Sequence, residues 1–393
     1  MSERTAQPLK VLVFTTVFPS PALPTQGIFT PARIGPLKDD CEIRVVSPTA
    51  WFRRKSKVPA RGTWDGFQVE YPSFYNVPGL LRGLNGVFLF ASSVGRVAAL
   101  RRDFDFDLID AHFTYPDGFA AVLLGKVFNR PVTITLHGTL VMLAAVPRRR
   151  PALAWALRNA DRLMSVSQEL ARKAVELGAA PERIEVIENG VDTRRFALRD
   201  RAEARRALGL PESGRLLISV GHLTRRKGHH RVLDLLPELL QQVPDLRFVV
   251  IGRSSLEGDA GPELREQARR LGIEDRVIWA GERTPDEVAM WLNAADVFVL
   301  PSDFEGCPCS VYEAMASGLP VVASKVGEVE RMVPVGMGFL IDRPDDRQGL
   351  REALLRALGK EWDREAIRAY AEGRSWEIGA RRILEQWRLA ARR

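Results

Sequence analysis

Two glutamates and the residues between them form the part of this chain best suited to hold a charged ligand. The segment from Glu305 to Glu313 reads Glu-Gly-Cys-Pro-Cys-Ser-Val-Tyr-Glu. An apolar run at 297–300 precedes it, and Gly and Pro follow it as stop signals. The pattern predicts a strand, a loop over 303–308 and a short helix over 310–317, directly followed by another strand.

The start of that helix is a predicted anion site, because free amides and the helix dipole attract negative charge there. Pro308 has no N–H, so the amides of Cys309 and Ser310 are the expected donors. One carboxylate on each side of a diphosphate can accept hydrogen bonds from a ribose and from a sugar. Glu305 and Glu313 therefore fit a nucleotide diphospho-sugar. The alternative is an ordinary loop carboxylate and an exposed helix residue.

Basic residues follow a second apolar run, at 216–220. They are Arg225, Arg226 and Lys227. Cations opposite a diphosphate stabilise the charge that develops on a leaving phosphate. These side chains are therefore candidates for donor binding, with a solvated basic turn as the alternative.

Three residues of the N-terminal half also follow apolar runs. Gly27 lies in a Pro-rich loop after the first run, and a glycine lets backbone approach a phosphate closely. His112 and His137 each come directly after a run, where the crevice residues of a parallel sheet are expected. An ordinary connector and two part-buried structural histidines are the alternatives.

Short apolar runs alternate with longer periodic segments in both halves of the chain. The expected strands are 10–14, 42–47, 68–71, 108–111, 132–136, 162–166 and 184–187, then 215–220, 246–251, 277–280, 297–300 and 320–323. The expected helices include 118–128, 168–177, 228–242, 262–271, 286–294 and 310–317. This alternation is typical of βαβ units, so it predicts an α/β fold of two doubly wound, Rossmann-like domains. Ligands are expected at strand carboxyl ends, in a crevice between the domains.

The domain boundary is expected in the polar, Arg-rich stretch 193–214, which ends in Leu-Pro-Glu-Ser-Gly and is predicted to be a linker. It separates a first domain, 1–192, from a second, 215–372. The last segment, 373–393, contains a predicted amphipathic helix from Trp376 onward.

Several of these segments resemble the GT-B retaining glycosyltransferases of family 4. The motifs that carry the resemblance are Glu-Asn-Gly-Val-Asp (188–192), Val-Gly-His-Leu-Thr-Arg-Arg-Lys-Gly (220–228), Val-Ile-Gly (250–252), Asn-Ala-Ala-Asp-Val-Phe-Val-Leu-Pro-Ser (293–302) and the segment 305–313. The resemblance covers most of the chain. It implies an acceptor-binding first domain, a nucleotide-sugar-binding second domain and a C-terminal helix that crosses back to the first.

The resemblance also implies roles for residues of the second domain. Glu305 is expected to contact the donor sugar, and Glu313 the ribose hydroxyls. Lys227 matches a lysine that lies on the diphosphate. His222 stands where the family has an arginine, so His222 itself, or Arg225 or Arg226, is expected to make that contact.

In the first domain the resemblance places His137 toward the donor sugar and diphosphate. The catalytic candidates are thus His137, Lys227 and Glu305. The donor-binding candidates are Gly27, His112, His222, Arg225, Arg226, Gly252, Cys309, Ser310 and Glu313.

No metal and no cofactor are expected. Asp103, Asp105 and Asp107 form an Asp-x-Asp pattern that binds a metal in a different glycosyltransferase fold, but here it leads straight into an apolar run. Lys227 and the helix amides can balance the diphosphate charge instead. Two neighbouring cysteines, at 307 and 309, are too few for a zinc site and are expected to be small buried residues of the loop.

Charge is distributed unevenly along the chain. Residues 1–200 hold 27 Lys+Arg against 19 Asp+Glu, which accounts for the whole net charge of +8. The excess predicts an anionic partner on that half, such as a membrane surface near Arg148, Arg149 and Arg150, near 51–55 or along 80–102. A charge that only keeps the protein in solution is the alternative.

Few cysteines and no signal-peptide pattern predict a cytoplasmic protein, peripheral on the inner face of the membrane.

Together these features predict a hexosyltransferase that moves a sugar from a nucleotide diphospho-sugar to an acceptor hydroxyl, with retention of configuration. The acceptor is expected to be a sugar or a lipid-linked glycan, in polysaccharide, glycolipid or cell-envelope glycan synthesis. No nucleic-acid partner is expected. A GT-B sugar phosphorylase or epimerase and a non-catalytic sugar-binding protein remain alternatives. A dehydrogenase is disfavoured because no Gly-x-Gly-x-x-Gly follows a strand.

Overall fold

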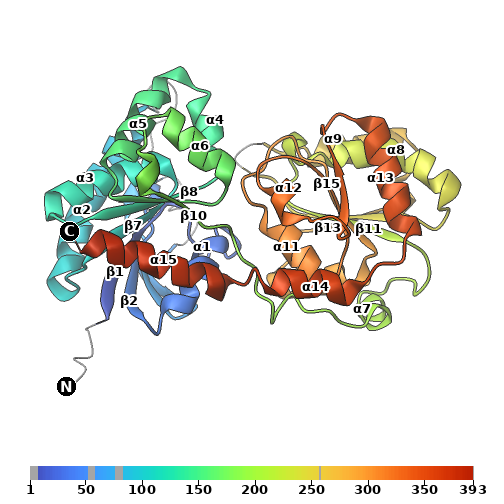
Figure 1. Cartoon of the computed structure of the whole chain (residues 1–393), viewed down its shortest axis with the longest axis horizontal. Coiled ribbons are helices and arrows are strands. Elements are labelled where there is room, and N and C mark those ends of the chain that lie inside the picture. The colour runs from blue at the N-terminus through green and yellow to red at the C-terminus, as the bar shows by residue number, and fades with distance from the viewer. Residues whose placement is uncertain (1–7, 52–57, 76–82, 256–257, 393) are drawn as a thin grey trace. The chain divides into compact units, whose positions relative to one another are not determined.

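The structure is a computed structural model that describes residues 8–51, 58–75, 83–255 and 258–392. The chain divides into two compact units. Unit 1 comprises Met1–Asn189 and Trp376–Arg393, and unit 2 comprises Gly190–Ser375. Each unit has a largely or wholly parallel sheet covered by helices (Figure 1). The predicted α/β class with two doubly wound domains is confirmed.

Unit 1 contains an eight-stranded sheet in the order β10-β9-β8-β7-β1-β2-β5-β4, in which β4 is antiparallel to β5 and the other pairs are parallel. The strands are β1 (Leu9–Phe14), β2 (Cys41–Val46), β4 (Arg61–Trp64), β5 (Phe67–Glu70), β7 (Leu108–His112), β8 (Val132–Leu136), β9 (Arg162–Ser165) and β10 (Ile184–Val186), with a separate pair β3 (Thr49–Ala50) and β6 (Ser73–Phe74). The helices are α1 (Phe29–Ile34), α2 (Asn85–Asp103), α3 (Phe119–Phe128), α4 (Thr139–Ala144), α5 (Arg150–Asn159), α6 (Gln168–Glu176) and α15 (Trp376–Ala391).

The C-terminal helix α15 belongs to unit 1, as expected, although the residues before it in the chain belong to unit 2. Its apolar face, with Ala380, Ile383 and Trp387, is buried in the same hydrophobic cluster as Val11 and Val13 of β1. The helical spacing of these residues explains why one face of α15 is apolar. Figure 1 shows α15, in red, lying along the unit that starts the chain.

Unit 2 contains a six-stranded, parallel sheet in the order β13-β12-β11-β14-β15-β16. The strands are β11 (Leu216–Val220), β12 (Arg247–Ile251), β13 (Val277–Gly281), β14 (Val297–Leu300), β15 (Val321–Ser324) and β16 (Gly338–Ile341). The helices are α7 (Arg201–Ala207), α8 (His229–Gln242), α9 (Gly261–Arg270), α10 (Pro285–Ala294), α11 (Cys309–Ala316), α12 (Val329–Met332), α13 (Arg347–Gly359) and α14 (Arg364–Glu372). Both faces of the sheet are covered, which accounts for the nearly uninterrupted apolar strands.

The strand order reverses direction at one point in each sheet. In unit 2 the chain runs outward from β11 to β13 and then restarts at β14, on the other side of β11. In unit 1 the corresponding point lies between β1 and β7. Loops on either side of such a reversal diverge and leave a crevice at the carboxyl ends of the strands, which is where open α/β sheets bind ligands.

The stretch 193–214, predicted as a linker, is instead a structured part of unit 2 and contains α7. Arg205 of α7 donates to a carboxylate oxygen of Asp296 at 2.7 Å, and both side chains are buried. The same carboxylate accepts from Arg201 at 2.6 Å and from the backbone N–H of Leu216 at 2.8 Å. A polar, Arg-rich composition was therefore mistaken for a solvated connector, because its cations meet a buried carboxylate far along the chain.

Replacing Asp296 by alanine is expected to lower the free energy of unfolding by about 3–5 kcal/mol, because it leaves the buried Arg205 guanidinium without its counter-charge. Urea unfolding followed by circular dichroism measures the change. Arg206→Ala is the matched control: it breaks the exposed pair between Arg206 and Glu212 and should cost less than about 1 kcal/mol. Equal effects of the two substitutions would contradict the buried network.

In the part of the chain that the structure describes, no helix combines the length and apolarity needed to cross a bilayer.

Candidate functional site

The loops after β11 and β14 bring two predicted site residues of unit 2 into direct contact. The Nζ of Lys227 donates to Oε1 of Glu305 at 2.7 Å, and both side chains are buried. Arg226 lies beside them: its Nη1 is 3.6 Å from the same carboxylate oxygen and donates to the carbonyl of Phe304 at 2.7 Å. A buried ion pair adds little stability over an apolar contact, so its position at the reversal of strand order indicates a functional role.

Two glycines make the close packing of these loops possible. A Cβ on Gly327, which has φ +59°, would lie 2.0 Å from the carbonyl oxygen of Glu305. A Cβ on Gly252, at the carboxyl end of β12, would lie 1.8 Å from the carbonyl oxygen of Gly221. Neither position leaves room for a side chain, so both glycines fix the backbone that surrounds the ion pair.

Helix α11 begins at Cys309 with Pro308 as its N-cap, so the amides of Cys309 and Ser310 lie in the first turn, as predicted. Glu313 lies one turn further along and is half-buried. Burial raises the pKa of Glu313 to about 7, against an opposing effect of the nearby Arg195 charge. The expectation for the cysteines is only partly right, since Cys307 is buried but Cys309 is half-buried.

The structure distinguishes between the basic candidates after β11. The guanidinium of Arg225 lies 3.4 Å from the carboxylate of Glu263, and both side chains are largely exposed. Arg225 thus faces away from Glu305, whereas Arg226 faces toward it. His222 follows the end of β11, and its carbonyl contacts Nε2 of the buried His229 at 3.2 Å. Of the two arginines, Arg226 is the one whose guanidinium lies beside the Lys227–Glu305 pair.

His229 was not singled out from the sequence, although it is buried at the first position of α8, two residues after Lys227. Burial lowers the pKa of His229 to about 4, and the charge of Lys227 adds to this effect. The ring is therefore neutral at physiological pH. The sequence Lys-Gly-His-His at 227–230 contains His229, but only its lysine was proposed as a site residue.

In unit 1 the two predicted histidines touch each other at the carboxyl ends of β7 and β8. Nδ1 of His112 lies 3.2 Å from Nε2 of His137, and the rings are stacked. The rings of Phe29 and Phe113 lie against His137, with centroids 5.0 and 4.5 Å away. His137 is 6% exposed, and burial, reinforced by electrostatic interaction with His112 and Arg33, holds its pKa well below the ordinary value.

A buried aspartate that the sequence analysis missed connects the loops at the same edge of the unit 1 sheet. The Asp117 carboxylate accepts from the backbone N–H of Thr16 at 2.9 Å and from the hydroxyls of Thr16 and Thr15. Burial raises the pKa of Asp117 to about 7, although these hydrogen bonds oppose the rise. Gly27, further along the loop after β1, has φ +68° and packs directly on the carbonyl of Val17.

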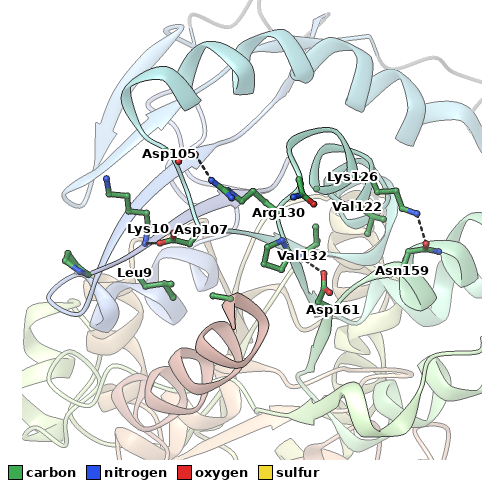
Figure 2. Close-up of a pocket in the computed structure, with 15 residues that line it drawn as sticks. Leu9, Lys10, Asp105, Asp107, Val122, Lys126, Arg130, Val132, Asn159 and Asp161 are labelled. Carbon is green, nitrogen blue, oxygen red and sulfur yellow. Dashed lines mark hydrogen bonds and ion pairs between the residues drawn. The ribbon is translucent and has the colours of Figure 1, made fainter. Parts of the chain in front are cut away.

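A cavity of about 880 Å³ lies elsewhere in unit 1, at the amino ends of β1 and β8 (Figure 2). Several of its charged groups have partners: Arg130 pairs with Asp105, Lys126 donates to Asn159, and Asp107 accepts from the backbone N–H of Lys10. Ligands of doubly wound sheets bind at the opposite edge. The predicted site residues do not line this cavity.

Two of the three aspartates of the Asp-x-Asp pattern have structural partners. Asp105 binds Arg101 and Arg130, and Asp107 accepts from the backbone N–H of Lys10. Within the described ranges, no group of three or more His, Cys, Asp or Glu side chains is arranged to hold a metal ion.

Two family descriptions match the sequence, one for each unit. "Glycosyltransferase Family 4" matches residues 28–195, and "Glycosyl transferases group 1" matches residues 200–374. Among similar proteins, a Bacillus subtilis glycosyltransferase named for teichuronic acid biosynthesis, TuaC, is 31% identical over 88% of this chain and 89% of its own length. A D-inositol 3-phosphate glycosyltransferase of Nocardioides is 30% identical, covering 84% of this chain and 78% of its own.

Solved structures share the fold at lower sequence identity. Sucrose-phosphate synthase from Thermosynechococcus elongatus superposes with a TM-score of 0.80, at 22% identity, over 97% of this chain and 98% of the other. Anabaena Alr3699/HepE in complex with UDP-glucose superposes with a TM-score of 0.70, at 21% identity, over 96% of this chain and 98% of the other.

Proposed function

Because this chain belongs to the group 1 glycosyltransferases of the GT-B fold, we propose that it transfers a sugar with retention of configuration. The donor is a nucleotide diphospho-sugar held by unit 2. The acceptor is a hydroxyl of a sugar or of a lipid-linked glycan in cell-envelope or polysaccharide synthesis. The relatives named for teichuronic acid and for inositol 3-phosphate support this class of acceptor.

The observation that carries the proposal is the buried contact between Lys227 and Glu305 at the strand reversal of unit 2. In our proposal the diphosphate binds Lys227, Arg226 and the first amides of α11. Glu305 then accepts hydrogen bonds from hydroxyls of the donor sugar, and Glu313 from those of the ribose. No metal is needed, because these cations and amides balance the charge on the leaving group.

The reaction that fits these groups is a displacement on one face of the donor sugar. The bond between the anomeric carbon and the diphosphate oxygen breaks, and the acceptor oxygen bonds to the same carbon from the same side. The acceptor proton passes to the departing phosphate oxygen. Lys227 stabilises the charge on that phosphate, and His137 is the proposed sugar-binding group of unit 1.

A screen of UDP-, GDP- and ADP-sugars by thermal shift tests the donor class, because ligand binding to the folded state raises the melting temperature. Transfer should require a nucleotide sugar and should release the nucleoside diphosphate, and NMR of the product should show the donor's anomeric configuration. An inverted product would disprove retention. Formation of a sugar 1-phosphate from a glycan and inorganic phosphate, without any nucleotide sugar, would indicate a phosphorylase.

The raised pKa of Glu313 predicts that donor binding depends on pH. Only the ionised carboxylate accepts two ribose hydrogen bonds, so the association constant should rise with pH and level off above the pKa of about 7. Below that value it should fall toward tenfold per pH unit. Isothermal titration with an intact nucleotide sugar at pH 6–8 measures this. Glu313→Gln should bind more weakly and should lose the pH dependence; an unchanged pH profile in that variant would contradict the assignment.

We also propose that unit 1 binds an anionic membrane surface, which would place the protein on the cytoplasmic face. Arg148 and Arg150 are exposed next to the exposed apolar side chains of Met142 and Val146. This combination suits an interface with acidic headgroups. Of the two other predicted basic stretches, residues 53–55 lie outside the described residues. In the stretch 80–102, Arg96 pairs with Glu70 and Arg101 with Asp105, so these two arginines already have acidic partners. Vesicle sedimentation should show binding to anionic but not neutral lipid, weakened in the double variant Arg148→Ala, Arg150→Ala; equal binding to both lipids would contradict the proposal.

A further inference from the structure

Behind His137, a row of hydrogen-bonding side chains runs into the interior of the unit 1 sheet. It passes from His137 to His112, then to Asp110 and then to Thr133. His112, Asp110 and Thr133 are at most 1% exposed, whereas His137 keeps 6% of its surface exposed. The row therefore has one end at the surface and three members that no ligand can reach directly.

The strand register explains how the row forms. Asp110 of β7 is paired with Thr133 of β8, and the Thr133 hydroxyl donates to Oδ1 of Asp110 at 2.5 Å. Two residues further along β7, on the same side of the sheet, His112 comes within reach of the other carboxylate oxygen: its Nε2 lies 3.3 Å from Oδ2. The structure gives that nitrogen no hydrogen-bond partner among the described residues, so the Asp110 carboxylate is the acceptor within its reach.

The chemistry of Asp110 fixes the protons along the row. An ionised carboxylate only accepts hydrogen bonds, so the ring nitrogen that faces it, Nε2 of His112, carries a proton. In a neutral His112 ring the other nitrogen, Nδ1, then carries no proton, so it must accept a hydrogen bond. Nε2 of His137, 3.2 Å away, therefore donates to it. The remaining nitrogen of His137, Nδ1, is left without a proton.

We propose that Asp110 and His112 are positioning residues that hold His137 in the tautomer with a bare Nδ1. Nδ1 then accepts a hydrogen bond from a hydroxyl of the sugar being transferred. This inference rests on the proposed role of His137. It goes further in two ways. It gives a positioning role to Asp110 and His112, which contact neither donor nor acceptor, and it makes His137 the acceptor in its hydrogen bond with the sugar hydroxyl.

The surroundings of His137 support a ring held in one state. Phe113 adopts φ +69°, which a bulky residue rarely does, and its ring lies against His137. Arg33 and His112 are the charged or titratable groups that act on the ring, and both disfavour its protonation. A neutral His137 is required for Nδ1 to accept, and these groups keep it neutral.

The tautomer can be measured without any substrate. The chain has five histidines, so long-range proton–nitrogen NMR of the labelled protein at pH 7.5 can be assigned by substituting the histidines one at a time. We expect His137 to be protonated at Nε2 and bare at Nδ1. A proton on Nδ1 of His137, or two protons on His112, would overturn the proposal, whether or not any variant folds.

Asp110→Asn tests the positioning role. Thr133 still donates to the amide oxygen, so the amide nitrogen faces Nε2 of His112 and reverses the row. His137 should then gain a proton on Nδ1, and kcat should fall about 10- to 100-fold while the dissociation constant of the nucleoside diphosphate stays within about twofold. Thr133→Val, which keeps the carboxylate, should leave the tautomer unchanged and lower kcat less than about threefold.

The possible failures are distinguishable. A loss of kcat in Asp110→Asn with an unaltered His137 tautomer would reduce Asp110 to a structural residue and refute the proposal. Absence of sugar transfer by the wild-type chain with every donor would refute the proposed function instead. In that case the NMR result still shows whether Asp110 and His112 set the proton on His137.

Discussion

Replacing Lys227 by alanine is expected to lower kcat about 10³-fold, the largest loss that we predict for a single side chain. Lys227 is the one ammonium among the basic candidates after β11, and it lies 2.7 Å from Glu305 in a buried setting. Removing one donor to a developing negative charge costs about 10²–10³ in other enzymes, and a charged donor costs more than a neutral one. The nucleoside diphosphate should also bind more weakly, because the diphosphate carries charge before and after transfer.

The matched control is Lys325→Ala, which removes an exposed lysine of unit 2 that pairs with Asp342. It should leave kcat within about twofold. Since Lys227→Ala also leaves Glu305 buried without its partner, the thermal unfolding of both variants must be compared, and activity must be measured well below the lower melting temperature. A folded Lys227→Ala protein with kcat within tenfold of the wild type would remove Lys227 from the proposed mechanism.

The fold was largely predictable because both units follow the simplest rules of parallel sheets. Fully buried strands such as β8 and β14 are short apolar runs, and their bounds agree with the predicted ones. Strand β4 was missed because its residues alternate between exposed and half-buried at the edge of the sheet, so it has no apolar run. Helix α7 was missed because its cations are satisfied by Asp296, from a distant part of the chain.

The candidate residues could be placed one by one at strand ends from the sequence, but the contacts between them could not be predicted. Lys227 and Glu305 could each be placed at a strand end, but their contact depends on β11 and β14 being neighbours, which is a matter of strand order. The pairing of Asp110 with Thr133 likewise depends on the register between β7 and β8. Asp110 lies within an apolar run and was passed over for that reason, although a carboxylate in a buried strand needs a partner.

Replacing Glu305 by glutamine should separate sugar recognition from diphosphate binding, because the two are expected to change in opposite directions. The amide cannot accept hydrogen bonds at both of its heavy atoms, so kcat should fall about 10²- to 10³-fold if Glu305 holds the donor sugar in the transition state. At the same time Lys227 loses the anion that competes with the ligand. The nucleoside diphosphate alone should therefore bind as tightly as before or up to about tenfold more tightly.

Glu330→Gln, at an exposed position of α12, should change neither quantity and serves as the control. A parallel loss of kcat and of diphosphate affinity in Glu305→Gln would mean that Glu305 acts only by orienting Lys227. Comparing Glu305→Gln with Lys227→Ala separates the two roles. Both substitutions should lower kcat, but only Lys227→Ala should weaken binding of the free nucleoside diphosphate. Opposite signs for that affinity would assign Lys227 to the diphosphate and Glu305 to the sugar, which their ion pair alone cannot do.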